Sequence, residues 1–566
     1  MKSIYRKIVL LSLTTFVTLM TSCTDFLTII PPDKLVHEQF WQTKDDVNGM
    51  LATSYLKLAS TDAVKRAIVW GELRADNLTY EASKSLSDPY AQIVMSTIDS
   101  ENDFTRWGVF YEAINYANLV IKYAPLVVER DPDFTKGDLD IVVGEMYAMR
   151  ALCHFYLVRT FRDIPMAMVP AINDSELPEY KQVHPLEALE MIMNDLNIAE
   201  GLVMATGNYS DVRHNCGRFT KNAVLAIKAD VNLWRAAFTA YYKANNDNNG
   251  LANVDVQNYY TQCIQNCQSI LNNIDQLYKN DKSNNSVEDT PYHLIANHDV
   301  IEIDNKSYQS ISYDMIFGIG NSRESIFELQ IDANLANGYS NGISNVFGCK
   351  DSGRQVEVPK KFIDKYEDDD LRKYSFTDCP YDGSMPATIK VAKYIYTSSP
   401  AVDGESLNTK NIVSNWIVYR QTDVMLMMAE ALVLQETTTA EDIKESFKLV
   451  DAINRRSMVD STSTKIESPL REPSNKLDAY ELVMDERARE LAFEGKRWYD
   501  LVRRALRDNT TDNIKFVAEK LTSGQETLKN KMVSIHHLFF PIHIEELRFN
   551  KHLHQNPAYI TGDKNK

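Results

Sequence analysis

The side chains whose type and number could support catalysis are the carboxylates, and the reaction they would suit is glycoside hydrolysis. That reaction needs two carboxyl groups about 5 Å or about 6.5–9.5 Å apart across a sugar. With 78 Asp and Glu residues, some pair always meets this condition, and the densest run is Glu367-Asp368-Asp369-Asp370. Because Leu-Arg-Lys follows it, the run is typical of a solvated turn. No nucleophile elbow, phosphate loop, dinucleotide fingerprint or zinc-protease motif accompanies it, so the sequence favours a protein that is not an enzyme.

Metal-ligand spacings are equally sparse. The His pairs at 536–537 and 552–554 lack Cys or acidic partners at ligand spacing. The Asn-x-Asp-x-Asn-Gly run at 245–250 matches the first half of a calcium loop, but Val256 stands where a bidentate Glu is required. A loop connecting two helices is the favoured interpretation of that run. We therefore expect no metal and no cofactor.

Cys23 offers chemistry of another kind, acylation of its thiol. Residues 1–22 have the order of a secretory leader: a cationic start, a mostly apolar run at 8–20, then Thr21-Ser22. The apolar run is shorter than the ~20 residues that span a bilayer, and we expect no spanning segment elsewhere. Leu19-Met20-Thr21-Ser22-Cys23 resembles a bacterial lipobox, which would place several acyl chains on Cys23 and give stable anchoring. The alternative is an ordinary cleaved leader followed by a chance cysteine. Residues 23–42 contain Pro31-Pro32 and are expected to form an extended tether.

The charge and the cysteine count exclude several classes of protein. The formal net charge is −17, and removal of Lys2, Arg6 and Lys7 with the leader would make it −20. A field of that sign disfavours nucleic acid and other polyanions as ligands. Seven cysteines in 566 residues are too few for a disulfide scaffold. Cys263 and Cys267 fall on one face of a predicted helix, as two small core residues would.

The elements that would position any site are mainly helices. Apolar residues recur every three or four positions over 104–124, 144–161 and 221–242, with small residues between aromatic ones and Pro165 after the second helix. This pattern is typical of tetratricopeptide-like helical pairs, although no strict 34-residue repeat is present. Further helices are predicted at 419–434, 447–458 and 482–506, and short strands at 325–331 and 416–419. Long polar loops fall at 243–254, 280–310, 332–353 and 397–411. We predict one mainly α domain with an N-terminal helical part (43–275) and a loop-rich, then helical, C-terminal part (276–566).

The most distinctive stretch is Asp485–Arg504, which reads DERARELAFEGKRWYDLVRR. Its apolar residues, among them Leu491 and Trp498, can share one buried stripe of a helix. Its charged residues step by three or four positions along a neighbouring face and can form exposed helical ion pairs, each contributing ~0.3–0.5 kcal/mol. Gly495 in mid-helix would cost about 1 kcal/mol against Ala, which implies close packing there.

This stretch resembles the C-terminal signature of the SusD/RagB family. Further blocks resemble that family in the same order along the chain: the start at 23–32, EMYAMRALCHFYLVRTFRDIP at 145–165, and the segments at 218–236, 419–433, 451–457 and 541–559. Arg162 stands where the family usually has Gly. The resemblance covers nearly the whole mature chain.

The resemblance implies a lipoprotein of the outer membrane, facing the cell exterior, built as a tetratricopeptide-like scaffold with long loops. Members of the family lie over a SusC-like TonB-dependent transporter, to which they hand oligosaccharides or, in some branches, peptides, and they are not catalysts. We therefore expect capture of a glycan. A peptide-binding member of the family, a surface glycoside hydrolase and a structural or adhesive surface protein remain the alternatives.

The resemblance also places the ligand on variable loops. Aromatic rings cover the apolar faces of sugars, and acidic, amide and guanidinium groups bind their hydroxyls. The first candidate loop follows Trp70 and runs to about Asp103, and the second covers 332–354. The predicted ligand contacts are Asp76, Tyr80, Tyr90, Tyr339, Phe347 and Arg354. For each of them, packing within its own loop is the alternative.

Overall fold

The computed structural model describes residues 40–172, 180–247, 254–279, 291–296, 300–304, 307–331, 341–348, 353–380, 384–394, 414–458, 470–514 and 534–560. All structural statements below concern these residues. Helices make up most of them, and the strands form short antiparallel pairs. The mainly α class predicted from the sequence is confirmed. Cys23 and Tyr339 lie outside the described residues, as does the predicted loop at 397–411.

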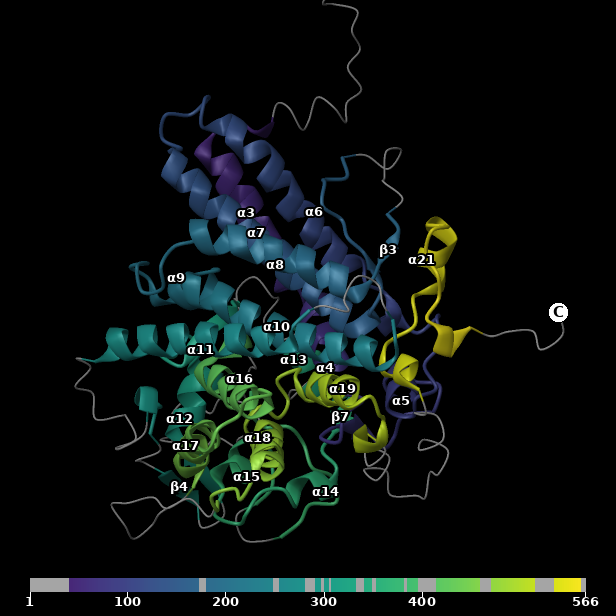
Figure 1. Cartoon of the computed structure of the whole chain (residues 1–566), viewed down its shortest axis with the longest axis vertical. Helices are drawn as coiled ribbons and strands as arrows, with labels where there is room; N and C mark the ends of the chain where they lie inside the picture. Colours follow the sequence, from purple (N-terminus) through teal and green to yellow (C-terminus); the bar gives the residue numbers. More distant parts are fainter. Residues whose placement is uncertain are drawn as a thin grey trace, which may run out of the picture.

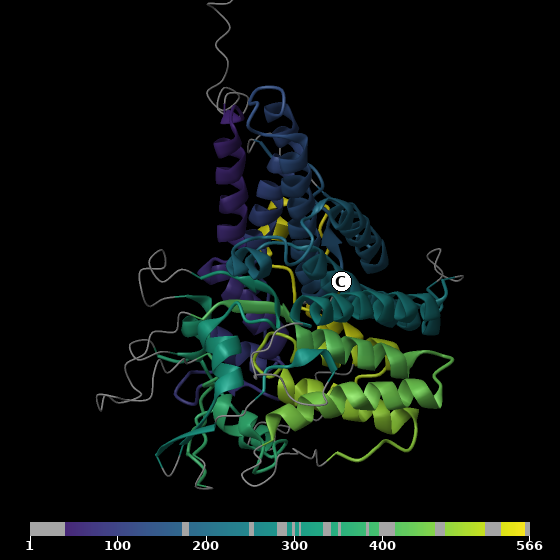
Figure 2. The ribbon, with the colours of Figure 1, turned by 90° about the vertical axis from the view of Figure 1, so that its left-hand side faces the viewer.

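Long antiparallel helices form the upper part of the molecule in Figure 1. They are α3 (Lys44–Leu58), α6 (Gly108–Tyr123), α7 (Lys136–Phe161) and α8 (Pro185–Leu202). α7 packs between α6 and α8, and α3 packs on α6. Below them, α10 (Lys221–Ala244) and α11 (Val256–Tyr278) run side by side across the middle (Figures 1 and 2). The helices predicted at 104–124, 144–161 and 221–242 are confirmed, and Cys263 and Cys267 both face the core from α11.

Helix α7 shows why length and composition alone mislead. It begins at a capping box, in which Thr135 and Asp138 satisfy each other's backbone N–H groups. By length and apolar composition it could cross a membrane, contrary to the expectation that no second segment would. Its most apolar window is mostly buried under α6 and α8, so it is a core helix. It ends at Phe161, and the next residue, Arg162, takes a positive φ of 71°. The strand Ile164–Pro165 follows.

The lower part of the molecule holds the C-terminal helices. α16 (Gln421–Leu434) packs on α11, α17 (Ala440–Ser457) and α18 (Lys476–Glu490), while α19 (Arg497–Asp508) packs on α10 and on α4 (Thr61–Glu72) (Figure 2). The shorter helices of the fold are α5 (Pro89–Val94), α9 (Val212–Gly217), α12 (Ile311–Tyr313), α13 (Gly342–Phe347), α14 (Lys360–Ile363), α15 (Leu371–Ser375) and α21 (Ile544–Phe549). The strand pairs are β1 (Thr79–Tyr80) with β7 (Val356–Glu357), β2 (Ile164–Pro165) with β3 (Gln182–Val183), β4 (Val300–Asp304) with β5 (Ser307–Ser310), and β6 (Ser325–Leu329) with β8 (Trp416–Arg420). The strands predicted at 325–331 and 416–419 are therefore confirmed and pair with each other.

The single helix predicted at 482–506 is wrong. α18 ends at Glu490 and α19 begins at Arg497, and the turn between them contains Phe493 and Gly495 with positive φ of 68° and 72°. Gly495 is therefore not a mid-helix glycine, although the close packing inferred from it is present. A Cβ on Gly71 of α4 would lie 1.9 Å from the carbonyl oxygen of Gly495. We call this contact, formed by Gly71 and Glu72 with the turn Leu491–Lys496, the junction.

The charged residues of this stretch are also not an exposed face. Glu490 is fully buried and accepts hydrogen bonds from Arg420 at 2.7 Å, Arg456 at 2.6 Å and Arg372 at 3.1 Å. These arginines come from β8, α17 and α15, far from α18 in the sequence. Pairs in this position are tertiary contacts, and removal of one partner of a buried pair costs about 3–5 kcal/mol. The charged residues recur every three or four positions, as they would on the exposed face of a helix. Because they are buried, their ion-pair partners instead come from other elements.

The junction predicts a specific sensitivity to a methyl group. Gly71→Ala should lower the free energy of unfolding by about 3 kcal/mol or more, because the new Cβ would meet backbone rather than a yielding side chain. The matched control is Gly49→Ala in the exposed face of α3, where no atom lies within 4 Å of the added Cβ. That change should raise stability by up to about 1 kcal/mol through helix propensity. Urea unfolding checks both, and equal effects of the two substitutions would contradict the described packing.

Candidate functional site

Two loops that the sequence analysis treated separately meet in a two-stranded ribbon. β1 pairs with β7 in the register Thr79↔Glu357 and Tyr80↔Val356. The backbone N–H of Glu81 extends the pairing by donating to the carbonyl of Gln355 at 3.0 Å. The candidate loops therefore form one surface, and neither is wholly irregular, because α5 lies in the first and α13 in the second. We call β1, β7 and the flanking Glu81 and Arg354 the ribbon.

The two faces of the ribbon differ in polarity. Neighbouring side chains of a strand point to opposite faces. Val356 is buried and Tyr80, paired with it, lies half-buried against the core. Thr79 and Glu357 pair on the other face, and Glu81 follows there by alternation. The outer face of the ribbon is therefore polar, while Tyr80, on the opposite face, is partly exposed.

An arginine joins the carboxylates of the two strands. Arg354 donates to Oε1 of Glu357 at 3.0 Å and lies 3.6 Å from Oε1 of Glu81. These three side chains are partly buried, at 12–26% exposure, and the two pairs together hold the guanidinium in one place. Carboxylates accept and a guanidinium donates, which together match the donor and acceptor character of a sugar hydroxyl. Glu81 and Glu357 could not be singled out from the sequence, because only the fold brings positions so far apart together.

Asp76 anchors the first loop to α19. Its two carboxylate oxygens accept from Nε of Arg497 at 2.8 Å and from its second guanidinium nitrogen at 3.1 Å. Burial alone would raise the pKa of the Asp76 carboxyl, but the charge and hydrogen bonds of Arg497, with Lys365, outweigh it and hold the pKa below its usual value. Asp76 is only 8% exposed. Its carboxylate is thus already paired, which disfavours the predicted ligand contact there.

Tyr90 and Phe347 are packing residues in this structure. Tyr90 lies in the first turn of α5, and its ring meets Phe104 edge-on with 4.9 Å between centroids. Phe347 ends α13 and stacks on Tyr394 at 5.7 Å. Both side chains are buried, so ligand contact at these two positions stays a prediction that burial disfavours. Of the predicted contacts within the described residues, Tyr80 and Arg354 are the partly exposed ones.

Glu72 links the first candidate loop to the junction. It is fully buried, and its carboxylate accepts from the side chain of Asn77 and from the backbone N–H groups of Gly495 at 2.9 Å and Lys496 at 3.3 Å. Burial raises the pKa of Glu72 to about 7, and these hydrogen bonds limit the rise. The side-chain oxygen of Asn77 has no hydrogen-bond partner among the described residues. A protonated Glu72 could donate to it after rotation of the amide.

The described residues contain no group of three or more His, Cys, Asp or Glu side chains placed to hold a metal ion. In the acidic run at 367–370, three carboxylates are exposed, in line with the predicted solvated turn. Asp370 departs from that prediction. It is buried, caps α15 and pairs with Arg372 at 2.8 Å.

Comparison with known proteins places these features in a family. One family model, described as the SusD family, matches residues 377–559, and a second, described as starch-binding and associating with the outer membrane, matches residues 25–233. SusD-like protein P38 of Formosa agariphila is 25% identical over 502 residues, covering 86% of this chain and 88% of that protein. SusD-like protein P25 of the same organism is 22% identical and covers 96% of both chains.

Solved structures show the same fold. NanU of B. fragilis matches with a TM-score of 0.62 at 18% identity, covering 94% of this chain and all of that one. A structure named as a laminarin binding SusD-like protein matches with a TM-score of 0.57 at 19% identity, covering 92% of this chain and all of that one. Identities this low establish the architecture and leave the ligand open.

The buried carboxyl group of Glu72 predicts a pH dependence of stability. Its folded pKa of about 7 lies above the ordinary value of 4.5, so its contribution is fully present below pH 4.5 and is lost as pH rises through 7. Glu72→Gln should behave like the wild type at pH 4.5 and be more stable at pH 8 by up to about 3 kcal/mol. Urea unfolding at several pH values checks this. The exposed Glu129→Gln serves as the control, and parallel profiles for wild type and Glu72→Gln would contradict the assignment.

Proposed function

Because this chain belongs to the SusD/RagB family, we propose that it is a cell-surface lipoprotein that captures a glycan and delivers it to a SusC-like TonB-dependent transporter of the outer membrane. The observation that carries the proposal is the meeting of both candidate loops in one ribbon on a family scaffold. In this proposal Cys23 carries the lipid, and residues 23–42 tether the helical body to the membrane.

Three findings support glycan as the ligand. The model that matches residues 25–233 is described by starch binding and outer-membrane association. A structural relative is named for laminarin binding. The ribbon offers a fixed guanidinium, two carboxylates and the partly exposed Tyr80 within a short span. Such a mixture of donors, acceptors and an aromatic ring suits a hydroxyl-rich ligand.

Capture without catalysis is the second part of the proposal. Members of this family are binding proteins, and the carboxylates of the ribbon are already engaged with Arg354, Ser83 and the N–H of Ala82. A glycosidase needs one carboxyl group kept protonated and a second free to attack or to activate water. Glu81 and Glu357 instead share the guanidinium of Arg354, so neither carboxylate is free to attack or to activate water. The ribbon therefore fits recognition of hydroxyl groups better than hydrolysis.

The direct experiment is a calorimetric binding screen of Thr24–Lys566 against soluble plant, host and microbial glycans, with reducing-sugar release followed in the same samples. Saturable heat without product is the expected result. Product formation would overturn the proposal that the chain is not an enzyme. Heat with peptides and none with any glycan would move the chain to a peptide-binding branch of the family.

With a glycan in hand, Tyr80→Ala combined with Arg354→Ala should weaken its binding at least about tenfold, or ~1.4 kcal/mol. Loss of the aromatic ring and of the fixed guanidinium removes both kinds of contact. The matched control is Phe549→Ala with Arg548→Ala, since both side chains are exposed on α21, 80% for Phe549. Unchanged affinity in the ribbon variant, or an equal loss in the control, would place the ligand elsewhere.

A further inference from the structure

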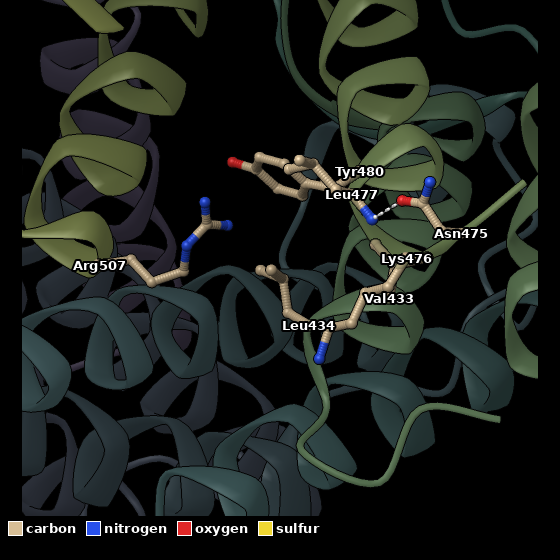
Figure 3. Close-up of a pocket in the computed structure, with 7 residues that line it drawn as sticks. All are labelled: Val433, Leu434, Asn475, Lys476, Leu477, Tyr480 and Arg507. Carbon is tan, nitrogen blue, oxygen red and sulfur yellow. Dashed lines mark hydrogen bonds between the residues drawn. The ribbon is translucent and has the colours of Figure 1, made fainter. Parts of the chain in front are cut away.

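A concave surface separate from the ribbon lies at the opposite end of α19 from the junction. It is an open groove of about 570 Å³, shown in Figure 3. The residues that line it include Val433 and Leu434 from the end of α16, Lys476, Leu477 and Tyr480 from the first turns of α18, and Arg507 near the end of α19. Arg507 lies ten residues along α19 from Arg497, roughly 15 Å at the helical rise, so the groove is separate from the contact of Arg497 with Asp76.

The floor and one wall of the groove are apolar. Leu477 is 64% exposed, which is unusual for a large aliphatic side chain placed on a concave surface. Behind it, Val433, Ala479, Tyr480 and Met484 form a small buried cluster of their own, against which Leu434 packs. Burial of Leu477 by a partner would be favourable at about 25 cal/mol per Å² of apolar surface removed from water.

Two cations share the groove. The guanidinium of Arg507 lies over the ring of Tyr480, 4.1 Å from its centroid, and its Nε donates to Asp508 at 2.7 Å. The ammonium of Lys476 donates to the backbone carbonyl of Gln435. Burial, together with the charge of Arg507, lowers the pKa of Lys476, while Glu436 opposes that shift. Because both cations line one groove, an anion bound there would interact favourably with each of them.

The same geometry argues against a sugar. The ring of Tyr480 is 3% exposed and its face is covered by Arg507, so it offers no stacking surface. The groove is also open, whereas sites for free small molecules usually enclose most of their ligand. An open groove suits a segment held in place by the rest of a larger interface.

We propose that this groove docks an extended segment of a partner protein in which an acidic side chain is flanked by aliphatic ones. The carboxylate lies between Lys476 and Arg507, and an aliphatic neighbour covers Leu477 and Leu434. The charged side chains that line the groove, Lys476 and Arg507, are both cations, and on a chain of net charge −17 they give such a partner a specific place to bind. The inference is independent of the glycan site.

The test measures fluorescence anisotropy of labelled peptide libraries with Thr24–Lys566. Three libraries differ only at the centre: Asp or Glu between aliphatic residues, the corresponding Asn or Gln, and Lys. We expect saturable binding of the acidic library, at least about tenfold tighter than that of the amide library and weakened by salt. Equal affinity for acidic and amide libraries, or no saturable binding of the acidic one, would overturn the proposal.

Variants locate the binding. Lys476→Glu and Arg507→Glu should each weaken binding of the acidic library at least about tenfold, and the double variant should prefer the Lys library. Leu477→Ser should also weaken binding of the acidic library. Misfolding would not explain that loss, because this exposed side chain can change without disturbing the core. The control is Lys448→Glu on the exposed face of α17. Affinity that is insensitive to all the groove variants, or that also falls in the control, would overturn the assignment to the groove.

Discussion

Glu490 at the end of α18 lies fully buried among three guanidinium groups, and much of the lower half of the molecule depends on that arrangement. A lone buried carboxylate would be far too costly to keep charged, so β8, α15 and α17 must deliver their arginines together. The three cations outweigh the effect of burial and hold the pKa of Glu490 well below its usual range. Neighbouring pairs repeat the pattern: Lys393 with Glu494 at 2.5 Å, and Arg456 with Glu324 at 2.8 Å. These polar contacts specify one packing of elements that apolar burial alone would leave less defined.

From this network the chain turns directly into the junction. The turn after Glu490 presses Gly495 against Gly71 and offers two N–H groups to Glu72, while Arg497, the next residue but one, binds Asp76. The polypeptide that follows Asp76 forms β1 of the ribbon. The stretch that resembles the family signature is therefore a structural connector between the two halves of the chain. Through Arg497 it holds Asp76, which lies just before β1 of the ribbon. This explains why the signature identifies the family without naming a ligand.

Periodicity in the sequence predicted the existence of α6, α7, α10, α16 and α17, because their apolar residues recur at helical spacing, although α7 and α17 begin eight and seven residues earlier than predicted. The prediction of a helix was wrong at 491–496, where the chain forms a turn although its residues continue the helical spacing. The charged residues of this turn pair with distant elements. Tyr90 and Phe347 were assigned to irregular loops, whereas the structure places them in the short helices α5 and α13, where both are buried. Ligand contact at these two positions stays a prediction. Residues such as Glu81 and Glu357 could not be predicted from sequence, since their meeting depends on strand pairing across most of the chain. The family and the fold could thus be predicted from the sequence, whereas the residues that meet in the ribbon could not.

The most direct test of this account is a crystal structure of Thr24–Lys566 with a glycan bound. The account predicts that the sugar lies on the ribbon, with hydroxyl groups hydrogen-bonded to Arg354, Glu81 or Glu357 and with the exposed part of Tyr80 in contact with it. It also predicts that the junction is unchanged from the unbound form. A glycan bound away from β1 and β7, whether in the groove of Figure 3 or on the upper helices, would contradict the assignment of the ribbon as the site of capture.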